Sequence, residues 1–244
     1  MSQIGLEDPL AASRVCSYLV GEIEQMGYSI EVSSDFEKMA TDKAAARNEP
    51  LTPYFDPTIC HPSHDRFFWM KVVSKSGATS ALQAYRYDSV DTSLAEWGPS
   101  FRIGIYMLRQ EVLVPWHTAP PKNSIANRIR GKLIYHGEFW VDPHARNRLL
   151  LEKFSRLGMI LCHMKWNPDA IWGVCNKRMA EHGNPSRMGY PYMEKGFFRW
   201  QWTSEEDYFV EWLNVVERQS LEQMISEMND GLTAKYTEAE QIAR

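Results

Sequence analysis

The sequence predicts an α/β protein with antiparallel strands, a strand–helix–strand unit and helical extensions at both ends. Three observations predict this class. The chain has 244 residues, of which 44% are apolar, and this is enough to bury a sizeable core. Strand-like apolar runs dominate the middle of the chain. Segments with an apolar residue every three or four positions precede, interrupt and follow these runs, which is the period of an amphipathic helix.

Residues 1–64 are expected to form a helical segment and a loop. A helix over 9–27 has a proline in its first turn, an apolar stripe along one face and a glycine at its end. A short helix is expected over 36–47. The stretch 48–63 contains four prolines and should be a loop.

Residues 65–203 change character, because apolar runs separated by turn residues replace the helical period. A hairpin is expected first, since two strand-like runs flank the turn Ser76-Gly77. A helix over 144–164 interrupts the strands, with apolar residues at a 3.6 spacing. The remaining strands are expected at 101–108, 133–141, 170–174 and 196–202.

Residues 204–244 are expected to be a C-terminal helical extension. Ser204 followed by acidic residues suits a helix start. The apolar stripe comprises Phe209, Trp212, Leu213, Val216, Leu221, Met224 and Met228.

Composition excludes several classes of protein. Lys and Arg number 27 against 31 Asp and Glu, a net charge of −4, which argues against a generic nucleic-acid binder. Apolar stretches fall far short of the ~20 residues of a membrane-spanning helix, and the N-terminus has no signal-peptide pattern. Four cysteines without C-x-x-C spacing indicate reduced thiols. We therefore expect a soluble, cytoplasmic protein.

Familiar catalytic and metal-binding motifs are absent. The sequence has no P-loop, no G-x-G-x-x-G and no G-x-S-x-G, which argues against nucleotide hydrolases, dinucleotide enzymes and α/β-hydrolases. Cys60-His61-Pro-Ser-His64 has metal-capable side chains but no second cluster to complete a tetrahedral set. We therefore expect no metal.

Two strings carry a resemblance to a known family. The first is His136-Gly-Glu-Phe-Trp-Val-Asp-Pro-His-Ala-Arg-Asn-Arg-Leu-Leu-Leu-Glu-Lys-Phe, and the second, about 50 residues later, is Tyr192-Met-Glu-Lys-Gly196-Phe197. Together they resemble the core of the GNAT superfamily of acyl-CoA-dependent N-acyltransferases over roughly 65–200. The resemblance implies a GNAT-like mixed, mostly antiparallel central sheet flanked by helices.

The resemblance also implies a cofactor site. In the family, a strand pairs with the pantetheine arm, and the loop after it points N–H groups from a helix N-terminus at the pyrophosphate. The matching positions are Trp140, Val141, Arg146, Asn147, Arg148 and Leu149, and the resemblance implies that they bind acetyl-CoA or another acyl-CoA as co-substrate. The two family glycines of this loop are replaced here by Leu149 and Leu151.

Two catalytic residues follow from the same resemblance. Tyr192 matches the tyrosine that protonates the leaving thiolate, and Tyr190 is a nearby substitute. Glu138 lies where some members carry a general base, and strand alternation would place it on the face of His136 and Trp140. By the same resemblance, the backbone N–H of Trp140 or of Val141 would polarise the thioester carbonyl.

The function implied is transfer of an acetyl or longer acyl group to a small amine or an amino-acid-like acceptor. The replaced loop glycines keep a second hypothesis open, a non-catalytic GNAT-fold binding or assembly module whose C-terminal helix is a partner or homodimer surface. A third hypothesis is an N-acyl amino acid or acyl-homoserine-lactone-type synthase. An acyl-carrier protein would then dock on the basic run Lys122, Arg128, Arg130 and Lys132.

Overall fold

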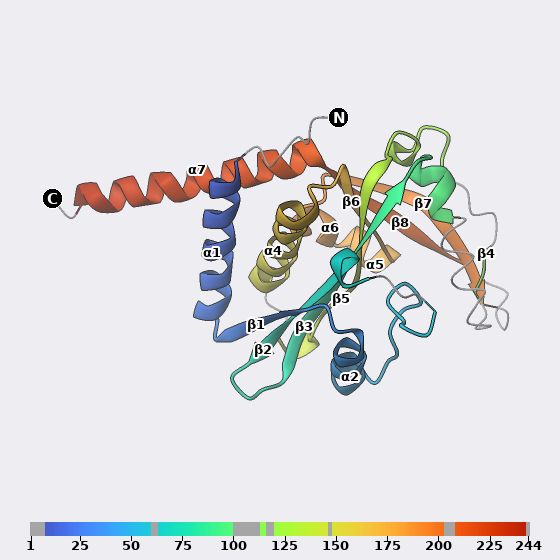
Figure 1. The fold of residues 1–244 in the computed structure, drawn as a ribbon, viewed down its shortest axis with the longest axis horizontal. Helices are drawn as coiled ribbons and strands as arrows, with labels where there is room; N and C mark the ends of the chain where they lie inside the picture. The colour runs from blue at the N-terminus through green and yellow to red at the C-terminus, as the bar shows by residue number, and fades with distance from the viewer. Residues whose placement is uncertain are drawn as a thin grey trace.

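The computed structural model describes residues 8–59, 63–99, 113–115, 120–145, 148–202 and 208–242. Within these ranges an eight-stranded sheet has the order β1-β2-β3-β5-β6-β8-β7-β4, with helices on both faces (Figure 1). Among the described strand pairs β5 and β6 are parallel, and all other neighbours are antiparallel. The sheet is therefore mixed and mostly antiparallel, and the predicted fold class is confirmed.

The elements follow in chain order. The strands are β1 (Tyr28–Ser33), β2 (Phe67–Ser74), β3 (Thr79–Val90), β4 (Leu113–Pro115), β5 (Gly131–Val141), β6 (Ala170–Cys175), β7 (Tyr192–Trp202) and β8 (Tyr208–Glu217). The helices are α1 (Pro9–Gln25), α2 (Phe36–Arg47), α4 (Arg148–Trp166), α5 (Lys177–Glu181), α6 (Asn184–Met188) and α7 (Arg218–Ile242). Short 3-10 turns are η1 (His64–Arg66), η2 (Ile125–Asn127) and η3 (Pro143–Ala145).

Helix α1 forms where the sequence predicts it. The Asp8 side chain accepts a hydrogen bond from the backbone N–H of Ala11 at 2.9 Å, and Pro9 occupies the first turn, where its missing N–H is not needed. Leu19 is buried at the contact with α4 and α7. Leu10, in the first turn of the same helix, is 69% exposed and lies outside the buried stripe.

Two hydrophobic cores lie on opposite faces of the sheet. On one face α1, α4 and α7 pack against alternate strand residues, and on the other face α2 and the loop after it do so. Neighbouring residues of one strand therefore belong to different cores, as strand alternation requires. Ile134 belongs to the α4-side core and Tyr135 to the α2-side core.

Segment 204–244 differs from the expectation of a continuous helix. Its first part contains β8, which lies between β6 and β7, and the helix α7 begins only at Arg218. Leu213 and Val215 belong to the α2-side core and Val216 to the α4-side core. A strand buried on both faces is apolar almost throughout, so its residues also fit a helical spacing. That ambiguity misled the sequence prediction.

Other elements refine the expectation. Strand β1 was not predicted, and it adds to the edge of the hairpin β2–β3, so residues from both ends of the chain enter the sheet. Helix α4 begins at Arg148 rather than at residue 144, because η3 precedes it. The predicted strand 101–108 lies outside the described residues.

Helix α7 crosses the end of α1 and continues past it (Figure 1). Leu221 and Ile225 are buried against the core that α1 and α4 share, so this part of its apolar stripe is covered by the chain itself. Neither α7 nor any other helix of the described ranges is long and apolar enough to cross a bilayer.

Candidate functional site

The two parallel strands part halfway along their length. Strands β5 and β6 pair at three positions only, from Leu133 with Ala170 to Tyr135 with Trp172. Both strands then continue, β5 to Val141 and β6 to Cys175. A cavity of about 330 Å³ opens beyond the last pair, and the diverging ends of both strands line it. The sheet is therefore open at its centre, between two strands that are firmly paired on their outer sides.

Residues from both faces of the sheet line this cavity, which we call the central cavity. From the α2 side come side chains of α2 and of the loop after it, namely Lys43, Arg47, Glu49 and Thr52. From the opposite side come side chains of α5, α6 and the turn before β7, namely Met179, Pro185, Met188 and Tyr190. The cavity is therefore reached by groups from both faces of the sheet.

A bulge in β5 decides which side chains face which side. Glu138 has a φ of +54°, and the pairing of β5 with β3 shifts register between Leu82 and Ala84. His136 stacks on Tyr85 in the α4-side core. Glu138 instead bonds to α2, on the opposite face. The expectation that His136 and Glu138 share a face is therefore wrong, because the extra residue of the bulge interrupts the alternation.

Glu138 is held in a buried ion pair. The Lys43 Nζ atom lies 2.5 Å from its Oε2, and the backbone N–H and hydroxyl of Thr52 both donate to its Oε1 at 2.6 Å. The side chains of Lys43 and Glu138 are 4% and 1% exposed. A carboxylate buried in this way needs its partners to offset lost hydration. The pair joins α2 and the loop after it to β5, along one side of the central cavity.

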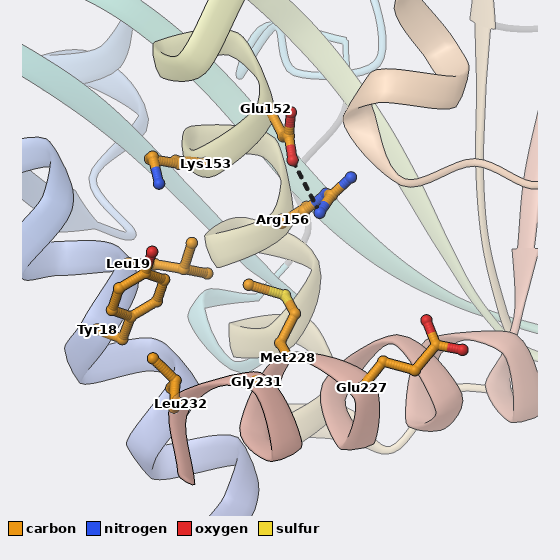
Figure 2. Close-up of a pocket in the computed structure, with 9 residues that line it drawn as sticks. All are labelled: Tyr18, Leu19, Glu152, Lys153, Arg156, Glu227, Met228, Gly231 and Leu232. Atoms are coloured by element: carbon orange, nitrogen blue, oxygen red, sulfur yellow. Dashed lines mark ion pairs between the residues drawn. The ribbon is translucent and has the colours of Figure 1, made fainter. Parts of the chain in front are cut away.

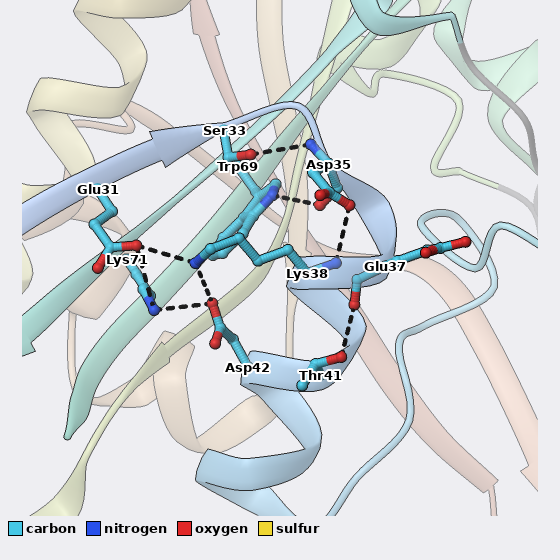
Figure 3. A network of polar contacts seen from close by, with 9 residues as sticks. All are labelled: Glu31, Ser33, Asp35, Glu37, Lys38, Thr41, Asp42, Trp69 and Lys71. Carbon is cyan, nitrogen blue, oxygen red and sulfur yellow. Dashed lines mark hydrogen bonds and ion pairs between the residues drawn. The ribbon is translucent and has the colours of Figure 1, made fainter. Parts of the chain in front are cut away.

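Helix α2 is also anchored at its other end, by a polar network (Figure 3). The Asp35 side chain accepts from the backbone N–H of Lys38 at 3.0 Å, and the Asp35 carbonyl accepts from the indole of Trp69 at 2.8 Å. Asp42 pairs with Lys38 at 3.0 Å and with Lys71 of β2 at 2.9 Å. The residue after Asp42 is the cavity lysine, so this network sets the position of α2 at the cavity wall.

A histidine–tyrosine pair lies on the opposite wall. The Nδ1 atom of His136 is 2.7 Å from the hydroxyl oxygen of Tyr190, and both side chains are buried. Burial lowers the pKa of His136 to about 3 and raises the pKa of Tyr190 well above 10, so both are neutral near pH 7. The Nε2 atom of His136 is buried and has no hydrogen-bond partner in the described part of the chain.

The predicted catalytic tyrosine lies elsewhere. Tyr192 is 38% exposed, its ring lies 5.7 Å from the guanidinium carbon of Arg128, and it does not line the central cavity. Tyr190, the substitute two residues earlier, does line it. Among the predicted catalytic residues, the structure thus brings Glu138 and Tyr190 to the cavity.

The predicted cofactor-binding residues surround the turn after β5. Trp140 packs on the α2-side core and Val141 on the α4-side core. Arg146 and Asn147 lie outside the described residues. Arg148 is the first residue of α4, and the side chain of Leu149 after it is 52% exposed.

Sequence reasoning missed the polar residues that α2 contributes. The spacing predicts the helix, but nothing in it marks Lys43 as buried or Arg47 as a cavity residue. His136 was noted only as a neighbour of Glu138. In the described ranges no group of three or more His, Cys, Asp or Glu side chains could hold a metal ion. Cys60 and His61 lie outside these ranges.

Two further cavities lie among the helices. One, of about 240 Å³, lies where α1, α4 and α7 meet, and its charged wall includes the pair Glu152–Arg156 at 2.9 Å (Figure 2). The other, of about 510 Å³, lies between α1, α7 and His163 of α4. Neither is lined by residues of the β5–β6 gap, so the central cavity is the candidate site.

The chain is similar to solved structures of acetyltransferases. Arabidopsis thaliana NAA60 in complex with acetyl-CoA has a TM-score of 0.44 and 10% identity, over 78% of this chain and 98% of that one. A GNAT-family acetyltransferase from Streptococcus pneumoniae has 0.42 and 8%, over 78% and 99%. Aminoglycoside acetyltransferase AAC(6')-Ib, in complex with coenzyme A and kanamycin, has 0.42 and 8%, over 80% and 98%. No family model and no curated protein matches the sequence.

Proposed function

We propose that this protein transfers an acyl group from coenzyme A to the amine of a small acceptor. The observation that carries the proposal is the central cavity, which opens between two parted strands and holds a neutral histidine–tyrosine pair. A bound acyl-CoA supplies the acyl carbon and a sulfur leaving group. The chain has to bind that arm, admit an amine and move one proton.

The gap between the strands suits an extended thioester arm. Past Tyr135 the β6-facing edge of β5 pairs with no strand in the described sheet, so its backbone groups can bond an extended ligand as a strand would. Gly173 of β6 lies close to the β5 backbone, at the point where the two strands begin to part. A Cβ atom there would lie 2.8 Å from the carbonyl oxygen of His136 and 3.5 Å from the hydroxyl of Tyr190. Any larger residue would therefore clash with the backbone of β5 and push the two strands out of their present positions.

The turn after β5 is the proposed phosphate site. It leads into the N-terminus of α4, and the partial positive charge at such a helix end favours anions. Leu149, which replaces a glycine of the family loop, is half exposed and therefore does not bury its side chain in the turn. Arg146, Asn147 and Arg148 are the proposed phosphate ligands.

Tyr190 and His136 are the proposed proton path. The Tyr190 phenol donates its proton to the departing sulfur as the carbon–sulfur bond breaks and the amine nitrogen bonds to the acyl carbon. The Nε2 atom of His136 accepts the proton that the amine loses. The Nδ1 atom of the same ring returns a proton to the Tyr190 oxygen. One proton leaves the nitrogen and one reaches the sulfur, so both side chains end neutral.

The test is thiol release. The full chain is mixed with acetyl-, butyryl- or octanoyl-CoA and a panel of primary amines, and free coenzyme A is measured with a thiol reagent. We expect amine-dependent release, and a rise in melting temperature with acyl-CoA, since a ligand at 100 times its Kd adds about 2.7 kcal/mol of stability.

The controls separate binding from turnover. The double variant Arg146→Ala with Arg148→Ala is expected to lose the rise in melting temperature that acyl-CoA causes. The control variant Arg14→Ala, on α1 and outside the turn after β5, is expected to retain it. A rise in melting temperature without turnover of any amine would support the binding-module alternative. No rise at millimolar acyl-CoA would overturn the proposal.

A further inference from the structure

The α2 side of the central cavity carries two cations in different states. Lys43 is 4% exposed and is neutralised by Glu138. Arg47, one helical turn later on α2, is 29% exposed and pairs with Glu49, whose side chain is 49% exposed. A pair this exposed contributes little stability and is readily replaced by another anion. Lys43 is therefore held in a buried ion pair, whereas Arg47 can exchange its partner for another anion.

The guanidinium of Arg47 has an unused edge. Its Nη2 atom contacts both oxygens of Glu49, at 2.9 and 2.7 Å. Its Nε and Nη1 atoms make no hydrogen bond with the described residues. The guanidinium carbon lies 5.9 Å from the ring centre of Trp140, which holds the group in place by a cation–π contact. A guanidinium with two free donors suits the two oxygens of a carboxylate.

We infer that the acceptor amine carries a carboxylate and that Arg47 binds it. The inference rests on the proposed acyl transfer and names its substrate class, amino acids and related amino carboxylates. Arg47 reaches the cavity from the α2 side, whereas Tyr190 reaches it from the opposite face. A carboxylate held by Arg47 leaves the amine of the same molecule directed towards the gap between β5 and β6. Arg47 thus sets acceptor specificity and takes no part in proton transfer.

The test compares acceptors that differ only in the carboxylate. Alanine is paired with ethylamine, leucine with isoamylamine and phenylalanine with phenethylamine, each with a saturating acyl-CoA. Arg47→Gln is expected to raise the KM of the amino acids about tenfold to 100-fold, the range of a lost charge-assisted contact. It should change the KM of the matched amines by less than about twofold.

Two other variants make the test specific. Glu49→Gln removes the anion that competes for Arg47, so it should lower the KM of the amino acids. Arg14→Gln, whose side chain bonds Asn229 on α7, is the matched control and should change neither class. An equal effect of Arg47→Gln on amino acids and amines would overturn the inference, and so would a wild-type preference for the carboxyl-free amines.

A binding measurement separates the two proposals. N-acetylphenylalanine and N-acetylphenethylamine are titrated into the protein by calorimetry, which requires no turnover. Tighter binding of the carboxylate by the wild type but not by Arg47→Gln would support the inference. Equal binding would overturn it. Turnover of carboxyl-free amines alone would leave acyl transfer standing without this acceptor class, whereas no turnover of any amine would count against the proposed function itself.

Discussion

At the scale of single residues, the sequence and the structure favour different tyrosines as the proton donor. Tyr192 matches the family string, but it is 38% exposed and outside the central cavity. Tyr190 is buried, and its hydroxyl lies 2.7 Å from Nδ1 of His136. A phenol whose pKa is raised by burial stays protonated at neutral pH, so it can donate a proton to a thiolate.

Replacing each tyrosine by phenylalanine distinguishes the two residues. Tyr190→Phe is expected to lower kcat about 100-fold, the size of a lost general acid, with little change in the KM of acyl-CoA. Tyr192→Phe should stay within about twofold of the wild type. Tyr190→Phe also leaves Nδ1 of His136 without its hydrogen-bond partner, and an unsatisfied buried group costs about 1–3 kcal/mol. Melting curves show whether the variant is still folded at the assay temperature. Loss of activity in Tyr192→Phe alone would instead support the proton-donor role that the resemblance implies for Tyr192.

At the scale of elements, the bulge in β5 and the position of α2 are coupled. The bulge turns Glu138 to the α2 side, where Lys43 and Thr52 complete its bonds. The predicted role of Glu138 as a general base competes with a positioning role, because both oxygens of the carboxylate are already engaged. In the second role Glu138 acts through α2, which also carries Arg47.

Substitutions in the buried pair test these two roles. Glu138→Gln leaves the Lys43 ammonium buried without its counter-ion, which should cost about 3–5 kcal/mol in urea unfolding. The double variant Lys43→Met with Glu138→Leu should recover most of that loss, since both charges are gone. Lys38→Met, in the exposed part of the Figure 3 network, is the control and should cost less than about 1 kcal/mol.

The activity of the folded double variant then decides between the roles. A general base contributes about 100-fold or more, so its loss should leave the double variant inactive and the pH profile altered. A positioning residue should leave measurable kcat with a raised KM for the acceptor. Stability equal to the wild type in Glu138→Gln would show that the ion pair does not anchor α2.

At the scale of the whole molecule, buried neutral histidines make stability depend on pH. Burial lowers the pKa of His136 to about 3 and, together with the nearby Arg218, that of His163 to about 4. In the unfolded chain histidine has a pKa near 6.5. Between these values the unfolded chain binds more protons than the folded one. The stability due to the neutral rings is therefore complete above about pH 6.5 and is lost as the pH falls towards 4 and 3.

Urea unfolding at two pH values measures this dependence. From pH 7 to pH 5.5 we expect a loss of about 1 kcal/mol for each of the two histidines. The variant His163→Asn should show about half of the wild-type loss, and His144→Asn, which is exposed on η3, should show all of it. A wild-type free energy of unfolding that is equal at the two pH values would contradict the burial of neutral rings.

Much of the fold could be read from local patterns. The helices over Pro9–Gln25 and Phe36–Arg47, the hairpin of β2 and β3, and the unit β5–α4–β6 all lie close to their predicted ranges. Each has a periodic apolar face or a clear start or turn residue, and these signals act over a few neighbouring positions. The strand β8 could not be read in this way, because burial on both faces removes its alternation.

The amino-acid sequence alone predicted the fold class, because that depends on periodicity. It also pointed to the strand around His136 and to acyl transfer as the chemistry to test, because these depend on residue type. The bulge at Glu138, the pairing of Lys43 across 95 positions and the place of Arg47 at the cavity depended on how distant segments pack. Which side of a strand a side chain faces, and whether a charge is buried or free, is set by contacts between segments far apart in the chain. No local pattern encodes those contacts.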